Sequence, residues 1–361
     1  MRIKYCLIFL FFVSFGKLFA QGDDPLFTFF PWGQSFYNPG AMGEKENHMN
    51  FVGILRQQSM GMRDTYADLE NSQDPDIPNN NEQKDKKTKY PSQGGQQVLL
   101  NIDSYIKKIR GAVGITFLKD LNGNDEGFNN TGFRVGYATK FRVHRGKLGI
   151  GIQFGFLNTK AVVDRWNPNQ PGDPTIALWN GEQSSIMNFD INFGLMYRTP
   201  TWYVGVSGTK LLGGVRVSGD ADMLTKTPQQ LYVSGGYIWE LKTAVPWSIE
   251  PHVLIRTNLA TWHLGVMALA RYNGILWFGM GYQNIGIAAL FGATPFYNQG
   301  NEYLKNLELG VAFTFPTTKF GYTSGGSWGD FELVVRYGFN FYKERTLSGY
   351  GSSRHLYKNQ Y

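Results

Sequence analysis

Residues 133–143, FRVGYATKFRV, alternate apolar side chains with small or basic ones. Successive side chains of a β-strand point to opposite faces, so one face of this segment is apolar. The other face carries three full positive charges and requires water or a polar lumen. Residues 187–197 repeat the pattern with Asp190 and Asn192 on the polar face. A soluble sandwich contains such strands too, so the rest of the chain decides between the two folds.

Fourteen segments with this alternation are predicted as strands. They are residues 48–58, 96–106, 110–118, 131–144, 147–159, 187–198, 201–210, 229–241, 246–257, 261–272, 275–283, 285–294, 306–316 and 330–342. Most have the length that a tilted strand needs to cross a bilayer. The even number is typical of bacterial outer-membrane barrels formed by one chain.

The links between these segments alternate between tight turns and longer polar loops. The tight links are 107–109, 145–146, 199–200, 242–245 and 273–274, and the longer ones are 59–95, 119–130, 160–186, 211–228 and 317–329. Links 258–260, 284 and 295–305 depart from the alternation. Short periplasmic turns and long outer loops are typical of membrane barrels. The strand pattern and the loop lengths therefore predict that residues 48–342 form an all-β, transmembrane antiparallel β-barrel of about 14 strands in an outer membrane.

The first 20 residues have the pattern of a secretory signal peptide, with Arg2 and Lys4 before an apolar run that ends near Ala20. Cys6, the only cysteine, lies in this leader, so no disulfide is expected in the mature chain. Removing three leader cations from the formal charge of +7 leaves +4. This mild charge argues against a nucleic-acid-binding protein.

Two segments flank the predicted barrel. Residues 21–47 are expected to form a periplasmic arm or a plug in the lumen, and residues 343–361 a short periplasmic tail. An even number of strands places both ends on the same side of the membrane. The tail is basic, and Arg345, Arg354 and Lys358 are candidates for contact with a partner. The loop 61–94 carries acidic and then basic residues and is either solvated or a docking surface for a secreted partner.

The polar faces of the predicted strands supply candidate lumen-facing residues. These are Arg134, Lys140, Arg142, Asp190, Arg198, Glu240, Glu250, Arg256, Arg271, Glu308, Glu332 and Arg336. Such mixed charges favour a lumen filled with ion pairs over a selective open pore.

The sequence lacks a recognisable catalytic constellation. No phosphate-binding loop is present, and Gly149, Gly151 and Gly155 have the wrong spacing for a dinucleotide. These glycines are expected to relieve crowding or allow a bend in the strand. His252 and His263 fall on lumen faces without forming a recognisable ligand set. The prediction is therefore a protein that is not an enzyme and has no cofactor or metal.

Short motifs near both ends of the mature chain are not explained by the requirements of a β-barrel alone. Near the start stand D-P-L-F-T at residues 24–28 and F-Y-N-P-G-A-M-G at residues 36–43. Toward the end stand W-F-G-x-x-Y at 277–282, K-F-G-Y at 319–322 and D-F-E-L-V-V-R-Y at 330–337. In this order they resemble the PorP/SprF family of type IX secretion system membrane proteins. The chain departs from the family pattern at Gly40, where alanine is usual, and at Gly329-Asp330-Phe331, where Ser-His is common.

The resemblance implies an outer-membrane barrel that works with the type IX export and gliding machinery. The partners it implies are a periplasmic ring-forming lipoprotein and secreted adhesins or other cargo with a C-terminal sorting domain. Asn38, Pro39 and Gly43 become candidates for contacting a partner or plugging the lumen. The alternative is a channel for small hydrophobic molecules of the fatty-acid-transporter type, which also has fourteen strands and an N-terminal plug. Charges on the lumen face argue against the apolar tunnel that such a channel needs.

Overall fold

The computed structural model describes residues 24–44, 48–60, 94–121, 128–161, 184–218, 227–241, 243, 246–283, 286–297, 304–317 and 327–340. Its first eight strands are β1 His48–Met60, β2 Gln96–Ile106, β3 Gly111–Leu121, β4 Phe128–Val143, β5 Gly146–Ala161, β6 Ser184–Arg198, β7 Trp202–Thr209 and β8 Val215–Ser218. The others are β9 Gln230–Tyr237, β10 Trp239–Leu241, β11 Trp247–Thr257, β12 Trp262–Tyr272, β13 Leu276–Gln283, β14 Gly286–Ala293, β15 Leu307–Pro316 and β16 Gly329–Asn340.

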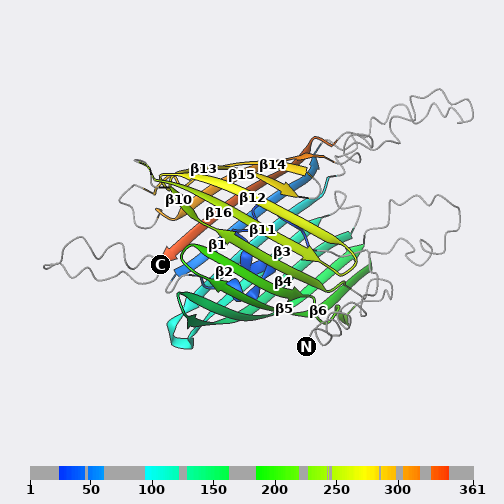
Figure 1. Cartoon of the computed structure of the whole chain (residues 1–361). Coiled ribbons are helices and arrows are strands. Elements are labelled where there is room, and N and C mark those ends of the chain that lie inside the picture. Colours follow the sequence, from blue (N-terminus) through cyan, green and yellow to red (C-terminus); the bar gives the residue numbers. More distant parts are fainter. Residues whose placement is uncertain are drawn as a thin grey trace, which may run out of the picture.

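The strands close into a barrel in which each of fourteen wall strands runs antiparallel to both neighbours (Figure 1). β1 pairs with β16, which joins the two ends of the sheet, and Val52 lies opposite Arg336 in that pairing. β9 pairs with both β7 and β11. The predicted fourteen-strand antiparallel membrane barrel is confirmed.

Two details differ from the predicted strands. The segment 229–241 is divided at Ile238, which lies between β9 and the separate short strand β10 and donates its N–H to the carbonyl of Thr201. The predicted loop 211–228 contains β8, which pairs with the start of β6. Both are local additions at the ends of wall strands, and the order of the wall is unchanged.

Alternation places the apolar face of β4 outside and its polar face inside. Phe133, Val135 and Phe141 have exposed fractions of 45%, 44% and 49%, whereas Arg134 is 8% exposed. The outward residues meet lipid in an outer-membrane barrel, because a lipid-exposed wall is apolar. The orientation predicted for residues 133–143 is therefore confirmed.

The two rims of the barrel differ, and we name them by their connections. The turn end carries the short links 107–110, 144–145, 199–201 and 273–275, together with the longer links 238–246 and 294–306. The loop end carries the long links 61–95, 162–183 and 210–229. Two loop-end links, 258–261 and 284–285, are short, and with the long turn-end link 294–306 they account for the three departures seen in the sequence.

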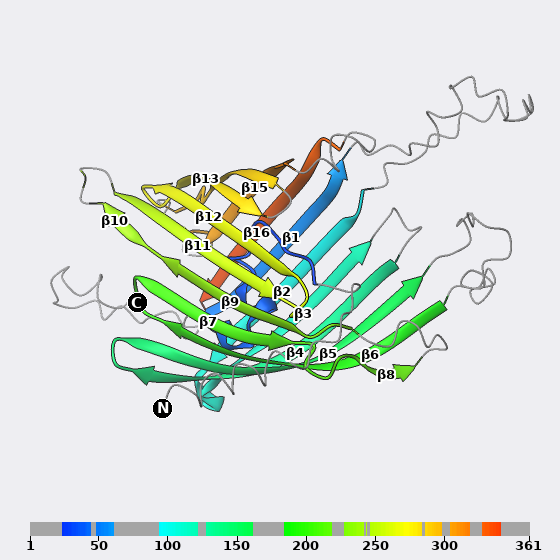
Figure 2. The same cartoon turned by 45° about the vertical axis from the view of Figure 1, so that its right-hand side comes forward.

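Residues 24–44 lie inside the barrel, where they form the dark blue segment enclosed by the wall in Figure 2. We call them the plug segment. It contains two short helices, α2 Gln34–Tyr37 and the 3-10 helix η1 Pro39–Ala41. Most of its side chains are buried, and Phe27, Phe29 and Phe36 have no exposed surface. Within the described ranges, no helix combines the length and apolar character needed to cross a membrane.

Candidate functional site

The lumen is the candidate site, because the plug segment and the polar wall residues meet there. The turn around Asn38 begins the η1 helix: its side-chain Oδ1 accepts the N–H of Gly40 at 2.8 Å. Its side-chain Nδ2 donates to the carbonyl of Leu195 on β6 at 2.9 Å. One side chain thus caps the helix and attaches it to the wall. Asparagine favours such caps because its short amide reaches nearby backbone groups.

Wall glycines form a shallow cradle for this turn. A Cβ placed on Gly151 would lie 2.3 Å from the carbonyl carbon and oxygen of Pro39. A Cβ on Gly40 would lie 2.8 Å from the carbonyl oxygens of Gly149 and Gly194. Glycine is used where two backbones approach this closely. The departure from alanine at residue 40 therefore has a steric reason in this chain.

Replacing Gly151 with alanine is expected to displace the Asn38–Ala41 turn and to cost about 1–3 kcal/mol of stability, because overpacking forces backbone shifts. The measurement is urea unfolding in lipid vesicles, with maleimide labelling of a cysteine at Ala41, which is 9% exposed. Gly281→Ala is the matched control, since a Cβ there meets its nearest atom at 3.4 Å. Equal stability and equal labelling of both variants would show that the cradle is not tight.

The charged cluster around Asp24 fixes the start of the plug segment. Its carboxylate lies 2.9 Å from Nη2 of Arg134 and 3.0 Å from Nζ of Lys210. Arg256 donates to the Asp24 backbone carbonyl, and Arg134 also donates to the Phe36 carbonyl at 3.0 Å. Burial raises the pKa of the Asp24 carboxyl, but the Arg134 and Lys210 charges outweigh it and hold that pKa well below its usual range. Asp24 is therefore a buried anion at neutral pH.

A second cluster connects the plug segment to the last wall strand. The Glu332 carboxylate, which is fully buried, accepts the N–H of Thr28 at 2.8 Å and its hydroxyl at 2.8 Å. Phe29 donates its N–H to the same carboxylate at 3.3 Å. Arg56 lies 3.6 Å from Glu332, pairs with Asp330 and donates to the Leu26 carbonyl. The plug backbone is thus bonded to β16 directly and to β1 through an arginine.

Aromatic side chains pack the plug segment against the β13 side of the wall. Trp277 is 2% exposed, and its ring centroid lies 5.2 Å from that of Trp32 and 6.1 Å from that of Phe29. A Cβ on Gly292 would lie 2.0 Å from the Trp277 ring, so the adjacent strand leaves room for the indole. Burial of such large rings is a major source of apolar stabilisation.

The plug segment leaves the lumen at the turn end through Gly43 and Glu44. Gly43 has a φ of +66°, a conformation that favours glycine, and it donates its N–H to the carboxylate of Asp103 at 2.8 Å. Glu44 pairs with Arg198 at 2.8 Å and with Arg336 at 3.5 Å. The side chains of these two arginines are 28% and 31% exposed, so their ion pairs with Glu44 are more accessible to water than those of the Asp24 cluster.

Most of the predicted lumen-facing residues contact the plug segment or one another. Those that contact the plug segment include Arg134, Lys140, Arg198, Arg256, Glu332 and Arg336. Arg271 pairs with Glu250 and Glu308 at 3.1 and 3.0 Å. Arg142 and Glu240 are exposed near the turn end. The tail candidates Arg345, Arg354 and Lys358 and the loop 61–93 lie outside the described residues.

Sequence reasoning did not single out several residues that hold the plug segment. Asp24 belonged to a quoted motif, yet its role as an ion-pair partner was missed. Arg56 is on the inward face of β1, and the alternation around the exposed Leu55 would have found it. Lys210 follows β7 immediately and was assigned to a strand end. In the sequence, each of the three is a fully charged residue within an apolar stretch or a predicted strand, and this feature could have identified it.

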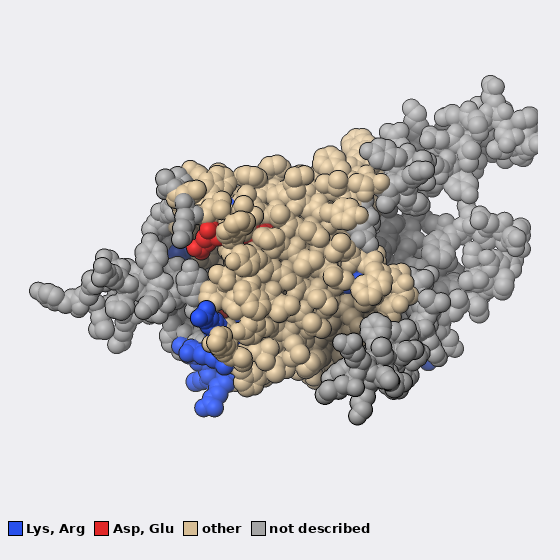
Figure 3. All heavy atoms as spheres, in the orientation of Figure 1, with Lys and Arg blue, Asp and Glu red and all other residues tan. Residues whose placement is uncertain are grey.

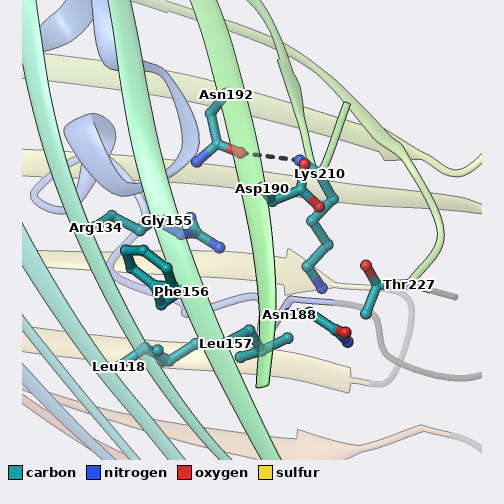
Figure 4. Close-up of a pocket in the computed structure, with 11 residues that line it drawn as sticks. Leu118, Arg134, Gly155, Phe156, Leu157, Asn188, Asp190, Asn192, Lys210 and Thr227 are labelled. Carbon is teal, nitrogen blue, oxygen red and sulfur yellow. Dashed lines mark hydrogen bonds between the residues drawn. The ribbon is translucent and has the colours of Figure 1, made fainter. Parts of the chain in front are cut away.

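A small hollow lies between β4, β5 and β6 on the loop side of the Asp24 cluster. Figure 4 shows Arg134, Asp190 and Lys210 directed into it. Asp190 accepts three backbone N–H groups, from Ile191, Leu212 and Gly214 at 2.8–3.1 Å. Among the described residues, no cluster of three His, Cys, Asp or Glu side chains has the geometry to hold a metal ion. The hollow is lined by both signs of charge.

Comparison with known proteins identifies the family. The model of the type IX secretion system membrane protein PorP/SprF matches residues 19–337, which is most of the chain. The chain belongs to the PorP/SprF family. As a PorP/SprF protein it is an outer-membrane component of type IX secretion. This family and the barrel fold are non-enzymatic in kind. No curated protein matches the chain.

Solved outer-membrane barrels resemble the PorP/SprF chain only in architecture. The monoaromatic hydrocarbon channel CymD is 11% identical with a TM-score of 0.45, covering 89% of this chain and 96% of that one. The toluene transporter TodX of Pseudomonas putida is 10% identical with a TM-score of 0.42, covering 85% and 93%. CdiB from Acinetobacter baumannii is 8% identical with a TM-score of 0.38, covering 82% and 60%.

Among the described residues, motifs from both ends of the sequence that carry the PorP/SprF resemblance meet inside the barrel, while K-F-G-Y at 319–322 lies outside the described residues. Thr28 of the first motif bonds to Glu332 of the last, although 304 residues separate them. Trp277 of a third motif packs on the plug segment, while Phe278 and Tyr282 of that motif are 48% and 46% exposed on the outside. Segments from both ends of the sequence thus build one plug–wall contact.

Proposed function

We propose that this protein anchors or couples secreted cargo to the periplasmic ring of the type IX machinery and does not conduct cargo through its own lumen. The observation that supports this is the plug segment held by the buried ion pair between Asp24 and Arg134 on β4, together with hydrogen bonds made by buried charged side chains on β1 and β16. Breaking a buried pair by removing one partner costs about 3–5 kcal/mol. A lumen filled in this way favours a rigid attachment point over a conduit.

The proposed partners follow from membership in the family. They are a ring-forming lipoprotein on the periplasmic side and a secreted adhesin or sorting-domain cargo. Short periplasmic turns are typical of outer-membrane barrels, so we assign the turn end to the periplasm. In this orientation the plug segment leaves the lumen on the periplasmic side at Glu44, and β16, which precedes the basic tail in the sequence, ends on the same side at Asn340. The plug exit and the tail are both candidate handles for the ring.

The second candidate is a channel for small hydrophobic molecules. It requires an apolar path that opens when the plug segment moves. The charges of Arg134, Asp190 and Lys210 around the hollow argue against such a path. The two functions differ in whether the plug segment must leave its site, so fixing it in place separates them.

Thr28 and Thr314 offer a disulfide for this test, because their hydroxyl oxygens lie 3.5 Å apart. The single cysteine of the chain is Cys6 in the predicted leader, so the variant Thr28→Cys/Thr314→Cys is expected to carry one internal pair. If the protein is an anchor, cells with the oxidised variant export sorting-domain cargo at the parent level. The ring lipoprotein also still co-purifies with the variant from detergent-solubilised outer membranes.

Each single cysteine variant is the control for loss of the Thr28 or Thr314 hydroxyl. A loss of export that appears only after oxidation and is restored by a reductant would show that the plug segment has to move. That result contradicts the anchor and supports a conduit. Loss of the lipoprotein with normal export would instead contradict the coupling role.

A further inference from the structure

The turn end carries a sector of exposed positive charge on its outer side. We name Lys107, Lys108, Arg110 and Arg145 the basic ledge. All four are exposed, and they come from the β2–β3 and β4–β5 turns. In Figure 3 the blue side chains gather at the lower left of the barrel, whereas the wall between the two ends is tan. The ledge is therefore local to one part of the rim.

The strand register places the two turns on neighbouring hairpins at the same end of the barrel. Gly111 at the start of β3 lies opposite Thr139, so β4 extends past β3 toward the turn end. The hydroxyl of Tyr137 on β4 donates to the carbonyl of Ile109 at 3.0 Å and holds the β2–β3 turn against β4. The η3 3-10 helix Lys107–Ile109 forms this turn, and Arg110 ends it in the left-handed conformation at φ +52°.

Nearby acidic residues are missing from the sequence of this sector. No Asp or Glu occurs between Asp103 and Asp120, or in residues 127–163. Asp103 is buried in the lumen, 5% exposed, where it accepts the N–H of Gly43. The turns at 199–201 and 273–275 carry no charge at all. The ledge is thus a concentration of positive charge in a sector whose sequence has no nearby acidic residue apart from the buried Asp103.

Apolar residues beside the ledge continue the lipid-facing wall. Ile106, Ile109, Phe141 and Val143 are 39–49% exposed. They stand at the ends of β2 and β4, in line with outward residues such as Val135. Lysine and arginine next to such a surface extend their charged ends to the membrane–water boundary. Lipid phosphates lie at this boundary, whereas a protein partner at the centre of the rim would meet the plug exit instead.

We propose that the basic ledge binds the phosphate groups of lipid headgroups in the leaflet at the turn end. The apolar residues enter the hydrocarbon while the four cations reach the phosphates above it. This contact holds one side of the barrel at a defined depth and keeps the plug exit at Glu44 facing the aqueous compartment. The inference rests on the membrane barrel and not on the coupling role, so either can fail alone.

The test is a lipid titration of the purified full chain in neutral detergent, followed by native mass spectrometry, with phosphatidylglycerol as the probe. We expect the parent to retain this lipid. Lys108→Gln/Arg145→Gln is expected to bind it roughly 25-fold more weakly, because each surface cation near anionic lipid contributes about fivefold. The matched control is Lys119→Gln/Lys160→Gln, which removes two exposed cations near the loop end and is expected to change binding less than twofold.

Heat-modifiable migration checks that each variant is folded, and the two single ledge variants replace the double variant if it is not. Equal binding of phosphatidylglycerol by ledge and control variants overturns the proposal. Inorganic phosphate that displaces the lipid completely would reassign the ledge as a free-phosphate site. A polyglutamate peptide that binds more tightly than the lipid, and depends on the ledge, would reassign it as a surface for an acidic protein.

Discussion

Asp24→Ala is expected to lower the free energy of unfolding by about 3–5 kcal/mol, the largest effect of any change considered for this barrel. The reason is that Arg134 and Lys210 would remain buried without their shared carboxylate, and their side chains are only 10% and 6% exposed. The measurement is urea unfolding of the barrel in lipid vesicles, together with proteolysis of the plug segment. We expect the plug segment to become cleavable before the wall unfolds.

The same carboxylate sets a pH dependence. Its pKa in the folded protein lies below its usual value of 3.8. The stability that Asp24 contributes is therefore fully present above the unfolded-state pKa and is lost only as the pH falls through the lower folded value. Lowering the pH from neutral to about 4 should leave the plug segment protected from protease if this site alone controls it.

Glu44→Ala is the matched control for Asp24→Ala, since Glu44 is also a plug carboxylate that pairs with two cations of the wall, Arg198 and Arg336. Its pairs are partly exposed, and exposed pairs contribute about 0–1 kcal/mol. If the two substitutions cost the same, burial of the Asp24 cluster does not stabilise the plug segment. If Asp24→Ala leaves protease protection intact, other contacts hold the plug segment alone.

Phe193→Arg is expected to destabilise the folded barrel by about 2–4 kcal/mol, because it places a cation on the lipid face near the bilayer midplane. Phe193 lies on β6 with a 42% exposed side chain, while the adjacent Asn192 is 2% exposed in the lumen. The free energy of unfolding in vesicles, measured by tryptophan fluorescence over a urea series, reports the change.

Phe141→Arg provides the comparison at a different depth. Phe141 is also outward, with 49% exposure, but it lies near the turn end of β4. Arginine near an interface costs about 0–1 kcal/mol. A cost at Phe141 as large as at Phe193 would contradict the depth assigned to these strands, and no cost at either would contradict a lipid-facing wall.

The wall was largely predictable from sequence because its physics is local. Alternation in residues 133–143 and 187–197 decides which side faces lipid, and tight links such as Asn273-Gly274 have turn chemistry of their own. The division of the strand at Ile238 and the short strand β8 were missed, since both depend on pairing partners far away in the sequence.

The plug contacts were less predictable because they are set by distant register. Alternation shows that Glu332 and Arg134 face inward, but it does not show which plug residue each one meets. The close approach of Gly151 to Pro39 left a signal, since three glycines in one strand suggested relief of crowding. The sequence does not show that the crowding comes from the plug backbone, because this contact depends on how β5 and the plug segment lie in the folded barrel.

The bond between Thr28 and Glu332 has a consequence for how the molecule assembles. The plug segment precedes every wall strand in the chain, yet this contact is to the last one, β16. Contacts between such distant residues carry the entropy of closing a long loop and form late. The plug segment therefore acquires its full set of contacts only when β1 pairs with β16. Closure of the barrel and filling of its lumen thus occur in one cooperative step. A chain that stops before β16 has neither the β1–β16 pairing that closes the barrel nor the Glu332 carboxylate that binds Thr28 of the plug segment.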